Sequence, residues 1–294
     1  MIDALSAGRQ EVTRFAPSPT GLLHLGHGYS ALFAWAAAMQ GGGRFLLRIE
    51  DIDIGRCRPE YEAAILEDLS WLGGDIGLAW EEPVRRQSQH MADYQDALDR
   101  LARQGLLYPC FCTRREIIAE IEAAGGAPHG PDGPLYPGTC RSLSADERAA
   151  RTAAGEQHAL RLDMDRARAV AGALTWVEEG IDAGEVTATP EVLGDAVLAR
   201  KDVATSYHLA VTVDDALQGV TLVTRGEDLK HATHLHRLLQ ALLDLPVPRW
   251  RHHRLLTAET GQRLAKRHES LTLAALREAG HSPAEVRKMA EFEG

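Results

Sequence analysis

The sequence predicts an α/β fold built on a doubly wound parallel sheet. The opening third of the chain alternates short β-like runs with helix-like runs, as in parallel strands joined by helices. A second β-rich region returns late in the chain, after a stretch of different composition. With 45% hydrophobic and 25% charged residues, the 294-residue chain has the composition of a packed globular protein. Such a sheet places binding sites at the carboxyl ends of its strands.

The first predicted strand, residues 12–15, is followed by a turn at residues 16–21 whose two prolines and glycine stop both strand and helix. An alanine- and leucine-rich run then predicts a buried helix that stops at three consecutive glycines. Pro59 favours the start of another helix. The predicted elements of this half are therefore a helix at 25–39, a strand at 44–49, and helices at 59–72 and 88–104.

Glycine and proline dominate residues 123–139 and predict a loop. Short alternating stretches after the loop, at 159–162 and 174–177, indicate a small inserted α+β subdomain. Further on we predict strands at 208–213, 220–224 and 253–257, a buried helix at 229–243 and two weak C-terminal helices. The predicted division is a first half of the sheet domain at 1–108, the insertion at 109–195, the second half at 196–250 and a C-terminal segment at 251–294.

Charge and hydropathy exclude several classes of protein. Lys and Arg number 32 against 42 Asp and Glu, a net charge of −10, so the overall field does not favour polyanions. A nucleic-acid face must be local, and its candidates are Arg249, Arg251, Arg254 and Arg267. The longest uncharged apolar run, residues 31–39, is too short for a membrane helix, and the N-terminus does not resemble a signal peptide. We expect a cytoplasmic protein without a membrane partner.

His24 and His27 flank Gly26 where the first helix begins. Phosphates favour this place, because unpaired backbone N–H groups and the positive end of the helix dipole point into it. Glycine at 26 and 28 leaves room for a flat base or ribose against the backbone. One histidine alone would be a capping or surface residue, but two around a glycine after a Pro-Thr-Gly turn predict a nucleotide site.

A polar, glycine-led loop at residues 260–268 carries three basic side chains close together. Lys266 would neutralise a leaving pyrophosphate, where negative charge develops when a carboxylate attacks an α-phosphate. Basic loops are also common on solvated surfaces. This loop therefore supports a nucleotide site only together with the two histidines.

Cys110, Cys112 and Cys140 are the candidate metal ligands. Thiolates are preferred structural ligands of zinc, and a tetrahedral site needs four donors. From chemistry alone, His129 would be the fourth. The alternative is that these are reduced, buried cysteines without a metal. Cys57 has no partner cysteine nearby, and we assign it no role.

In this order and spacing the motifs closely resemble class I glutamyl-tRNA synthetases. The resemblance implies a Rossmann-like synthetase domain with an inserted zinc-containing α+β subdomain and a short C-terminal helical segment. The segments that carry it are RFAPSPTG at 14–21, HLGH at 24–27, RIEDID at 48–53, VDD at 213–215, RGEDL at 225–229 and RLAKR at 263–267.

The segment after Lys266 is too short for the anticodon-reading helical domain of the full-length enzymes. With the zinc pattern, this resembles the glutamyl-queuosine tRNA(Asp) synthetases. Members of that family activate L-glutamate with ATP without needing tRNA and esterify it to the cyclopentenediol of queuosine at the wobble position of tRNA(Asp). The resemblance implies L-glutamate, ATP with Mg²⁺, queuosine-modified tRNA(Asp) and a structural Zn²⁺, and we expect a monomer.

The resemblance also implies roles for single residues. Arg14 would pair a glutamate carboxylate, which suits a planar guanidinium fork, and Glu50 would hold the ammonium group. The alternative is a set of structural ion pairs, above all at Arg48, Glu50 and Asp51. The implied sites are Arg14, Ala16, Ser18, Glu50, Tyr207 and Arg225 for glutamate; His24, Gly26, His27 and Lys266 for ATP, with His24, His27 and Lys266 catalytic; and Cys110, Cys112, Tyr136 and Cys140 for zinc, because the family places a tyrosine four residues before the last cysteine.

Ala265 departs from the family pattern, which usually has serine there. One hydroxyl donor to the nucleotide is lost, so we expect slower or weaker use of ATP. Two alternatives stay open: a minimal conventional glutamyl-tRNA synthetase that charges a tRNA 3′ end, and a degenerate paralogue that binds tRNA without catalysis. Ala265 is the only residue that favours the second.

Overall fold

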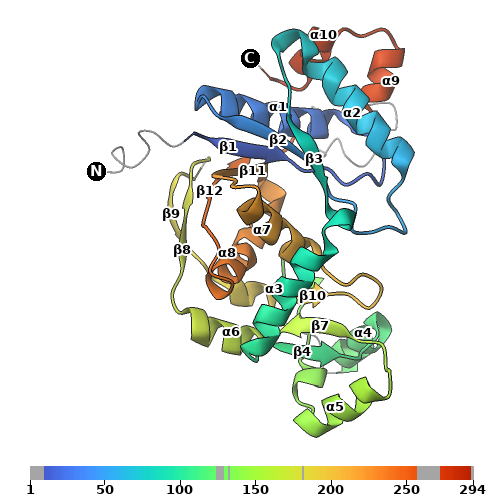
Figure 1. Cartoon of the computed structure of the whole chain (residues 1–294), viewed down its shortest axis with the longest axis vertical. Coiled ribbons are helices and arrows are strands. Elements are labelled where there is room, and N and C mark those ends of the chain that lie inside the picture. Colours follow the sequence, from blue (N-terminus) through green and yellow to red (C-terminus); the bar gives the residue numbers. More distant parts are fainter. Residues whose placement is uncertain (1–9, 124–128, 132, 181, 257–271, 293–294) are drawn as a thin grey trace.

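Two lobes follow one another along the long axis of the molecule (Figure 1). In this computed structural model, residues 10–123, 129–131, 133–180, 182–256 and 272–292 are described. One lobe contains the parallel strands with the first and last described residues, and the other contains the cysteines of the predicted metal site. Within the described residues, no helix is both long and apolar enough to cross a membrane.

Parallel strands run through the first lobe and confirm the predicted doubly wound α/β sheet. Thr221, just before β11, donates its N–H to the carbonyl of Val12 at 2.9 Å, so β11 begins beside β1 and joins two sets of strands. Within each set the paired strands are parallel, except for the β8–β9 hairpin. The spatial order is β3 (Glu81–Arg86), β2 (Arg44–Ile49), β1 (Val12–Phe15), β11 (Leu222–Gly226), β12 (Arg249–His253), β8 (Thr175–Glu178) and β9 (Gly184–Thr187).

Alternation along β2 divides its side chains between two faces, because successive side chains of a strand point in opposite directions. Phe45, Leu47 and Ile49 belong to the apolar core that also contains the first helices. Leu46 packs in a different core, and the guanidinium of Arg48 contacts α7 on that opposite side. The sheet therefore has one hydrocarbon face and one face that carries buried charge.

Helices cover both faces of this sheet. Those beside β1 and β2 share the first core, and the C-terminal helices pack on α2 (Figure 1). This group is α1 (Leu25–Gln40), α2 (Pro59–Gly73), α9 (Leu273–Glu278) and α10 (Pro283–Met289). On the other side lie α3 (Met91–Arg103), α7 (Tyr207–Leu217) and α8 (Ala232–Leu242); α7 meets the sheet through Asp215, and the apolar residues of all three helices share a core with the second lobe. The short turns η1 (Gly74–Ile76), η2 (Gln87–Gln89) and η5 (Glu227–Leu229) lie between elements.

The second lobe is built on an antiparallel sheet, in which β7 pairs with both β4 and β10. This is the mixed α+β character expected of the insertion. Its elements are β4 (Leu107–Cys110), α4 (Arg114–Ala123), β5 (His129–Gly130), β6 (Gly133–Pro134), η3 (Thr139–Arg141), α5 (Ala145–Ala153), β7 (Ala159–Leu162), α6 (Met164–Ala171), η4 (Pro190–Leu193) and β10 (Val197–Ala199). The expected boundary of the insertion at residue 195 stays a prediction. Two strands inside the expected insertion belong to the sheet of the first lobe, since β8 pairs with β12 and β9 pairs with β8.

Two predicted strands are wrong. Residues 208–213 belong to helix α7, whose first residue is Tyr207. A short run of β-branched residues fits a buried helix as well as a strand, and the Ser206 hydroxyl decides the matter by accepting from the N–H of Leu209 as the N-cap. The strand predicted at 253–257 lies earlier, at β12. β3 was missed, because its sequence EEPVRR is mostly charged.

Candidate functional site

A cavity of about 380 Å³ opens at the carboxyl ends of β1, β2 and β11 and at the N-terminus of α1. This is the edge where a doubly wound sheet places its ligands. All predicted glutamate and nucleotide residues line it except Lys266, which lies outside the described residues with Ala265. The lining includes Arg14, Ala16, Ser18, His24, Gly26, His27, Glu50, Tyr207 and Arg225.

His24 and His27 stack at the start of α1, with ring centroids 3.6 Å apart. His24 is the N-cap, and its Nδ1 accepts from the N–H of Gly26 at 3.2 Å, while Nδ1 of His27 accepts from the N–H of His24 at 3.3 Å. Burial lowers the pKa of His24, and burial together with His24 lowers the pKa of His27 to about 3. Both rings are therefore neutral near pH 7, with Nε2–H left as the donor.

The two glycines of this turn differ in their surroundings. A Cβ on Gly26 would lie 3.1 Å from the ring of His24, within the cavity wall. A Cβ on Gly28 would lie 3.0 Å from Leu72 of α2, so Gly28 allows close packing of two helices. The expectation that Gly28 leaves room for a base or ribose is wrong.

Each of the three guanidinium nitrogens of Arg14 has a partner within the protein. Its Nε and Nη2 donate to the two oxygens of Asp215 at 2.9 and 3.3 Å, and Nη1 donates to the carbonyl of Thr224 at 2.9 Å. Burial alone would raise the pKa of Asp215, but Arg14 and Arg48 hold it below its ordinary value. The Arg14 charge is thus already compensated by a carboxylate.

Glu50 follows β2 and borders the cavity. Arg48 donates to it at 3.2 Å and to Asp215 at 2.8 Å, so Arg48 is a structural ion-pair residue, the alternative considered from the sequence. Burial raises the pKa of Glu50, against the effect of Arg48 and Arg14. A carboxylate deprived of water in this way gains from an incoming ammonium group.

Arg225 differs from Arg14 in its partners. It is only 5% exposed, and none of the carboxylates in the described ranges forms an ion pair with it. Its nitrogens donate to neutral acceptors: Nε to Nε2 of His252 at 3.2 Å, Nη2 to the Thr233 hydroxyl at 2.6 Å, and Nη1 to His236 at 3.2 Å and Tyr207 at 3.5 Å. Burial lowers the pKa of Arg225. Arg225 therefore carries a buried positive charge that no carboxylate among the described residues neutralises.

Sequence reasoning missed the residues that hold Arg225. His252 lies on β12 and His236 on α8, and Glu178 at the end of β8 accepts from Nδ1 of His252 at 2.6 Å. The sequence RWRHH of β12 does contain two histidines that could have been considered. Without the fold, however, a histidine that faces inward cannot be distinguished from a solvated one.

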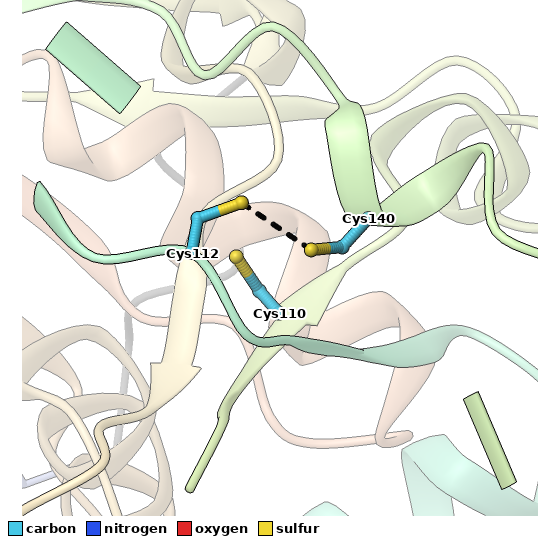
Figure 2. Close-up of side chains that lie close together, drawn as sticks. All are labelled: Cys110, Cys112 and Cys140. Carbon is cyan, nitrogen blue, oxygen red and sulfur yellow. Dashed lines mark hydrogen bonds between the residues drawn. The ribbon is translucent and has the colours of Figure 1, made fainter. Parts of the chain in front are cut away.

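Three thiols converge between β4 and η3 (Figure 2). The sulfur atoms of Cys110, Cys112 and Cys140 all lie within 4.8 Å of one another, and Sγ of Cys112 is 3.3 Å from Sγ of Cys140. Three soft donors at such distances fit a tetrahedral zinc site with one more ligand. The predicted cluster is therefore present and is consistent with a metal site.

The hydroxyl of Tyr136 lies 3.4 Å from Sγ of Cys110 and 3.6 Å from Sγ of Cys112, and it accepts from the N–H of Cys140 at 2.8 Å. It therefore stands at the open corner of the cluster. The side chain of His129, the alternative ligand, is not among those described.

The arginines considered for tRNA phosphates are paired with carboxylates. Arg249 contacts Glu11 and Glu179, Arg251 contacts Glu179 at 2.8 Å, and Arg254 contacts Glu291. Arg267 lies outside the described residues. These pairs reduce the charge that β12 offers to a polyanion.

Comparison with known proteins agrees with this site. The family of class I tRNA synthetases (E and Q), catalytic domain, matches residues 11–291. The chain is 49% identical over 284 residues to a glutamyl-Q tRNA(Asp) synthetase of Rhodobacter capsulatus, covering 95% of this chain and 99% of that protein. The chain belongs to the glutamyl-Q tRNA(Asp) synthetase family. The resemblance found in the sequence is thereby confirmed.

Another member of the glutamyl-Q tRNA(Asp) synthetase family, from Symbiobacterium thermophilum, is 45% identical over 283 residues, which are 93% of this chain and 83% of that one. Among solved structures, a glutamate tRNA ligase from Elizabethkingia meningosepticum in complex with its amino acid superposes with a TM-score of 0.77 at 27% identity. The match covers 97% of this chain and 61% of the ligase.

Proposed function

We propose that this protein activates L-glutamate with ATP, without tRNA, and transfers the glutamyl group to queuosine in tRNA(Asp). The observation that carries the proposal is Arg225, a buried guanidinium without a carboxylate partner among the described residues, in the same cavity as two neutral imidazoles at a helix N-terminus. One feature suits a substrate carboxylate and the other a triphosphate. The family to which the chain belongs supports the choice of acceptor.

In the first step, an oxygen of the substrate carboxylate attacks the α-phosphorus of ATP, and pyrophosphate leaves. Arg225 with Tyr207 holds a carboxylate of glutamate, Glu50 holds its ammonium group, and Ala16 and Ser18 line the same pocket. Arg14 contributes a compensated positive charge to the wall rather than a free fork.

His24 and His27 donate their Nε2–H groups to phosphate oxygens where charge develops. We assign the same task to Lys266, and Mg²⁺ bound with ATP would supply further compensation for the phosphate charge. In the second step, a hydroxyl of the queuosine cyclopentenediol attacks the activated carbonyl, and AMP leaves. No side-chain nucleophile is needed, so catalysis consists of positioning and charge stabilisation.

We further propose that Cys110, Cys112 and Cys140 hold a structural Zn²⁺ with Tyr136 as the fourth ligand. A closed four-ligand site stabilises the second lobe and offers no open position for chemistry. The tRNA substrate implies a cytoplasmic location.

The test is glutamate-dependent ATP–pyrophosphate exchange with and without tRNA, followed by transfer of labelled glutamate to queuosine-containing and queuosine-free tRNA(Asp). We expect exchange without tRNA and labelling of the modified tRNA alone. Exchange that requires tRNA, or an ester at the 3′ end, would assign a minimal conventional synthetase instead. No exchange at all would assign a binding protein without catalysis.

A further inference from the structure

A buried chain of three side chains ends at the glutamate pocket. Glu178, His252 and Arg225 are 2%, 4% and 5% exposed, and they come from three neighbouring strands, β8, β12 and β11. Glu178 and His252 do not line the cavity, so neither touches a ligand there. Their influence on a ligand must pass through Arg225.

The hydrogen bonds fix which nitrogen of His252 carries the proton. Glu178 Oε2 lies 2.6 Å from Nδ1 of His252, so Nδ1 carries the proton and donates it. Nε2 is then the acceptor for the Nε–H of Arg225 at 3.2 Å. Burial lowers the pKa of His252, which agrees with the neutral ring.

The carboxylate of Glu178 is itself held in place. Its Oε1 accepts from the backbone N–H of His252 and from that of Gly180, both at 2.9 Å. The carboxylate can therefore neither turn away from the ring nor exchange its two oxygens without losing these bonds.

The His252 ring separates the carboxylate of Glu178 from the guanidinium of Arg225, and this separation affects what Arg225 can bind. A carboxylate in direct contact would occupy the guanidinium fork, as Asp215 does with Arg14. His252 takes only the Nε–H of Arg225, while Glu178 supplies compensating charge one ring away. The remaining bonds of the guanidinium, to Thr233, His236 and Tyr207, also go to neutral groups, so its positive charge stays uncompensated for an anionic ligand and its direction is fixed.

We infer that Glu178 and His252 are positioning residues, which aim Arg225 at the carboxylate of glutamate and so set the affinity for this substrate. The inference rests on the proposed function in taking glutamate as the ligand. It predicts that the tautomer of His252, rather than its bulk, controls glutamate binding.

Glu178→Gln tests the tautomer at almost unchanged volume. The amide oxygen can still accept the two backbone N–H groups, and the amide NH₂ then faces Nδ1 of His252. The ring must move its proton to Nε2, where two donors, Nε2–H and the Nε–H of Arg225, oppose each other. We expect the glutamate Kd, measured by calorimetry, and the glutamate KM in exchange to rise ~10-fold or more, while the ATP KM changes little.

Two substitutions of His252 separate positioning from packing. A glutamine amide can reach the place of Nε2 and accept from Arg225, whereas an asparagine amide reaches only the place of Nδ1 and donates to Glu178. We expect His252→Asn to weaken glutamate binding much more than His252→Gln. A purely structural role predicts the opposite order, since asparagine preserves the buried contact to Glu178.

The matched control is Glu179→Gln, because Glu179 is the next residue and forms half-buried ion pairs with Arg249 and Arg251, away from Arg225. Unchanged glutamate binding in Glu178→Gln, or losses that follow the melting temperature in all variants, would overturn the inference. Calorimetry keeps the two proposals apart: a wild-type protein that binds glutamate but shows no exchange contradicts the function alone. A wild-type protein that does not bind glutamate contradicts both.

Discussion

Arg48 on β2 donates a hydrogen bond of 2.8 Å to Asp215 on α7, and the arginine side chain is completely buried. The same guanidinium lies 3.7 Å from Asp214, whose other partners are Arg85, Gln87 and Tyr94. Strand and helix are therefore joined by a charged cluster directly below the cavity.

Removing one partner of such a cluster leaves buried charge without compensation. We expect Arg48→Leu to reduce the free energy of unfolding by ~3–5 kcal/mol, measured by urea denaturation. Arg44→Leu is the matched control in the same strand, because its pair with Glu81 is exposed and is worth under ~1 kcal/mol. Equal urea midpoints for the two variants would contradict this view of the cluster.

The imidazole of His24 has two tasks that one substitution separates. Asparagine keeps the N-cap of α1, because its side chain also accepts from the first N–H groups of a helix. It cannot replace the Nε2–H donor. We expect His24→Asn to melt near the wild-type temperature and to lower the kcat of pyrophosphate exchange ~100- to 1,000-fold. Wild-type turnover in this variant would exclude His24 from phosphate stabilisation.

Stability should fall as the pH is lowered from 7 to 5. Several buried or half-buried histidines have pKa values below the ordinary value, so in this range the unfolded chain binds protons that the folded chain does not. Each contributes up to ~1.4 kcal/mol per pH unit below its ordinary pKa. Asp68 acts in the opposite direction, because burial raises its pKa to about 6. The histidines are His24, His27, His234, His236, His252 and His253.

The check is the urea midpoint at pH 7, 6 and 5 for the wild type and His253→Gln. Because His253 is buried and its pKa is lowered, the variant should flatten the dependence. A wild-type midpoint that rises toward pH 5 would show that the acidic groups dominate.

Zinc should copurify at ~1 atom per chain. Cys112→Ser removes a thiol of the cluster and should lower the zinc content and the melting temperature, while Cys57→Ser, outside the cluster, should change neither. Elemental analysis by mass spectrometry measures the content. Tyr136→Phe should weaken retention of zinc against a chelator, and unchanged retention would direct attention to His129 as the fourth ligand.

Sequence reasoning located the first half of the site well, because turns and helix starts are local. The prolines before Gly21 and the pair His24 and His27 define their own surroundings within a few residues, and the structure has both histidines at the start of α1 in the cavity wall. The cysteine cluster was equally accessible, since thiol chemistry restricts its use.

What escaped was the set of contacts between distant segments. Nothing local in TVDDAL reveals that Asp215 will meet Arg14 and Arg48, or in RWRHH that His252 turns inward to Arg225. Residues 208–213 were predicted as a strand and form a helix, since a short buried helix and a buried strand share one composition. Tertiary packing decides such cases.

The alternation along β2 makes the strand intolerant of a change in length. A deletion of one residue within it would exchange its two faces, turning Arg48 toward the hydrocarbon of α1 and a leucine toward Asp215. Substitutions that keep the phase of the strand can be absorbed one at a time, whereas a frame-preserving indel would disrupt the core and the pocket in a single event. Gene variation within this segment should therefore consist of replacements and not of insertions or deletions.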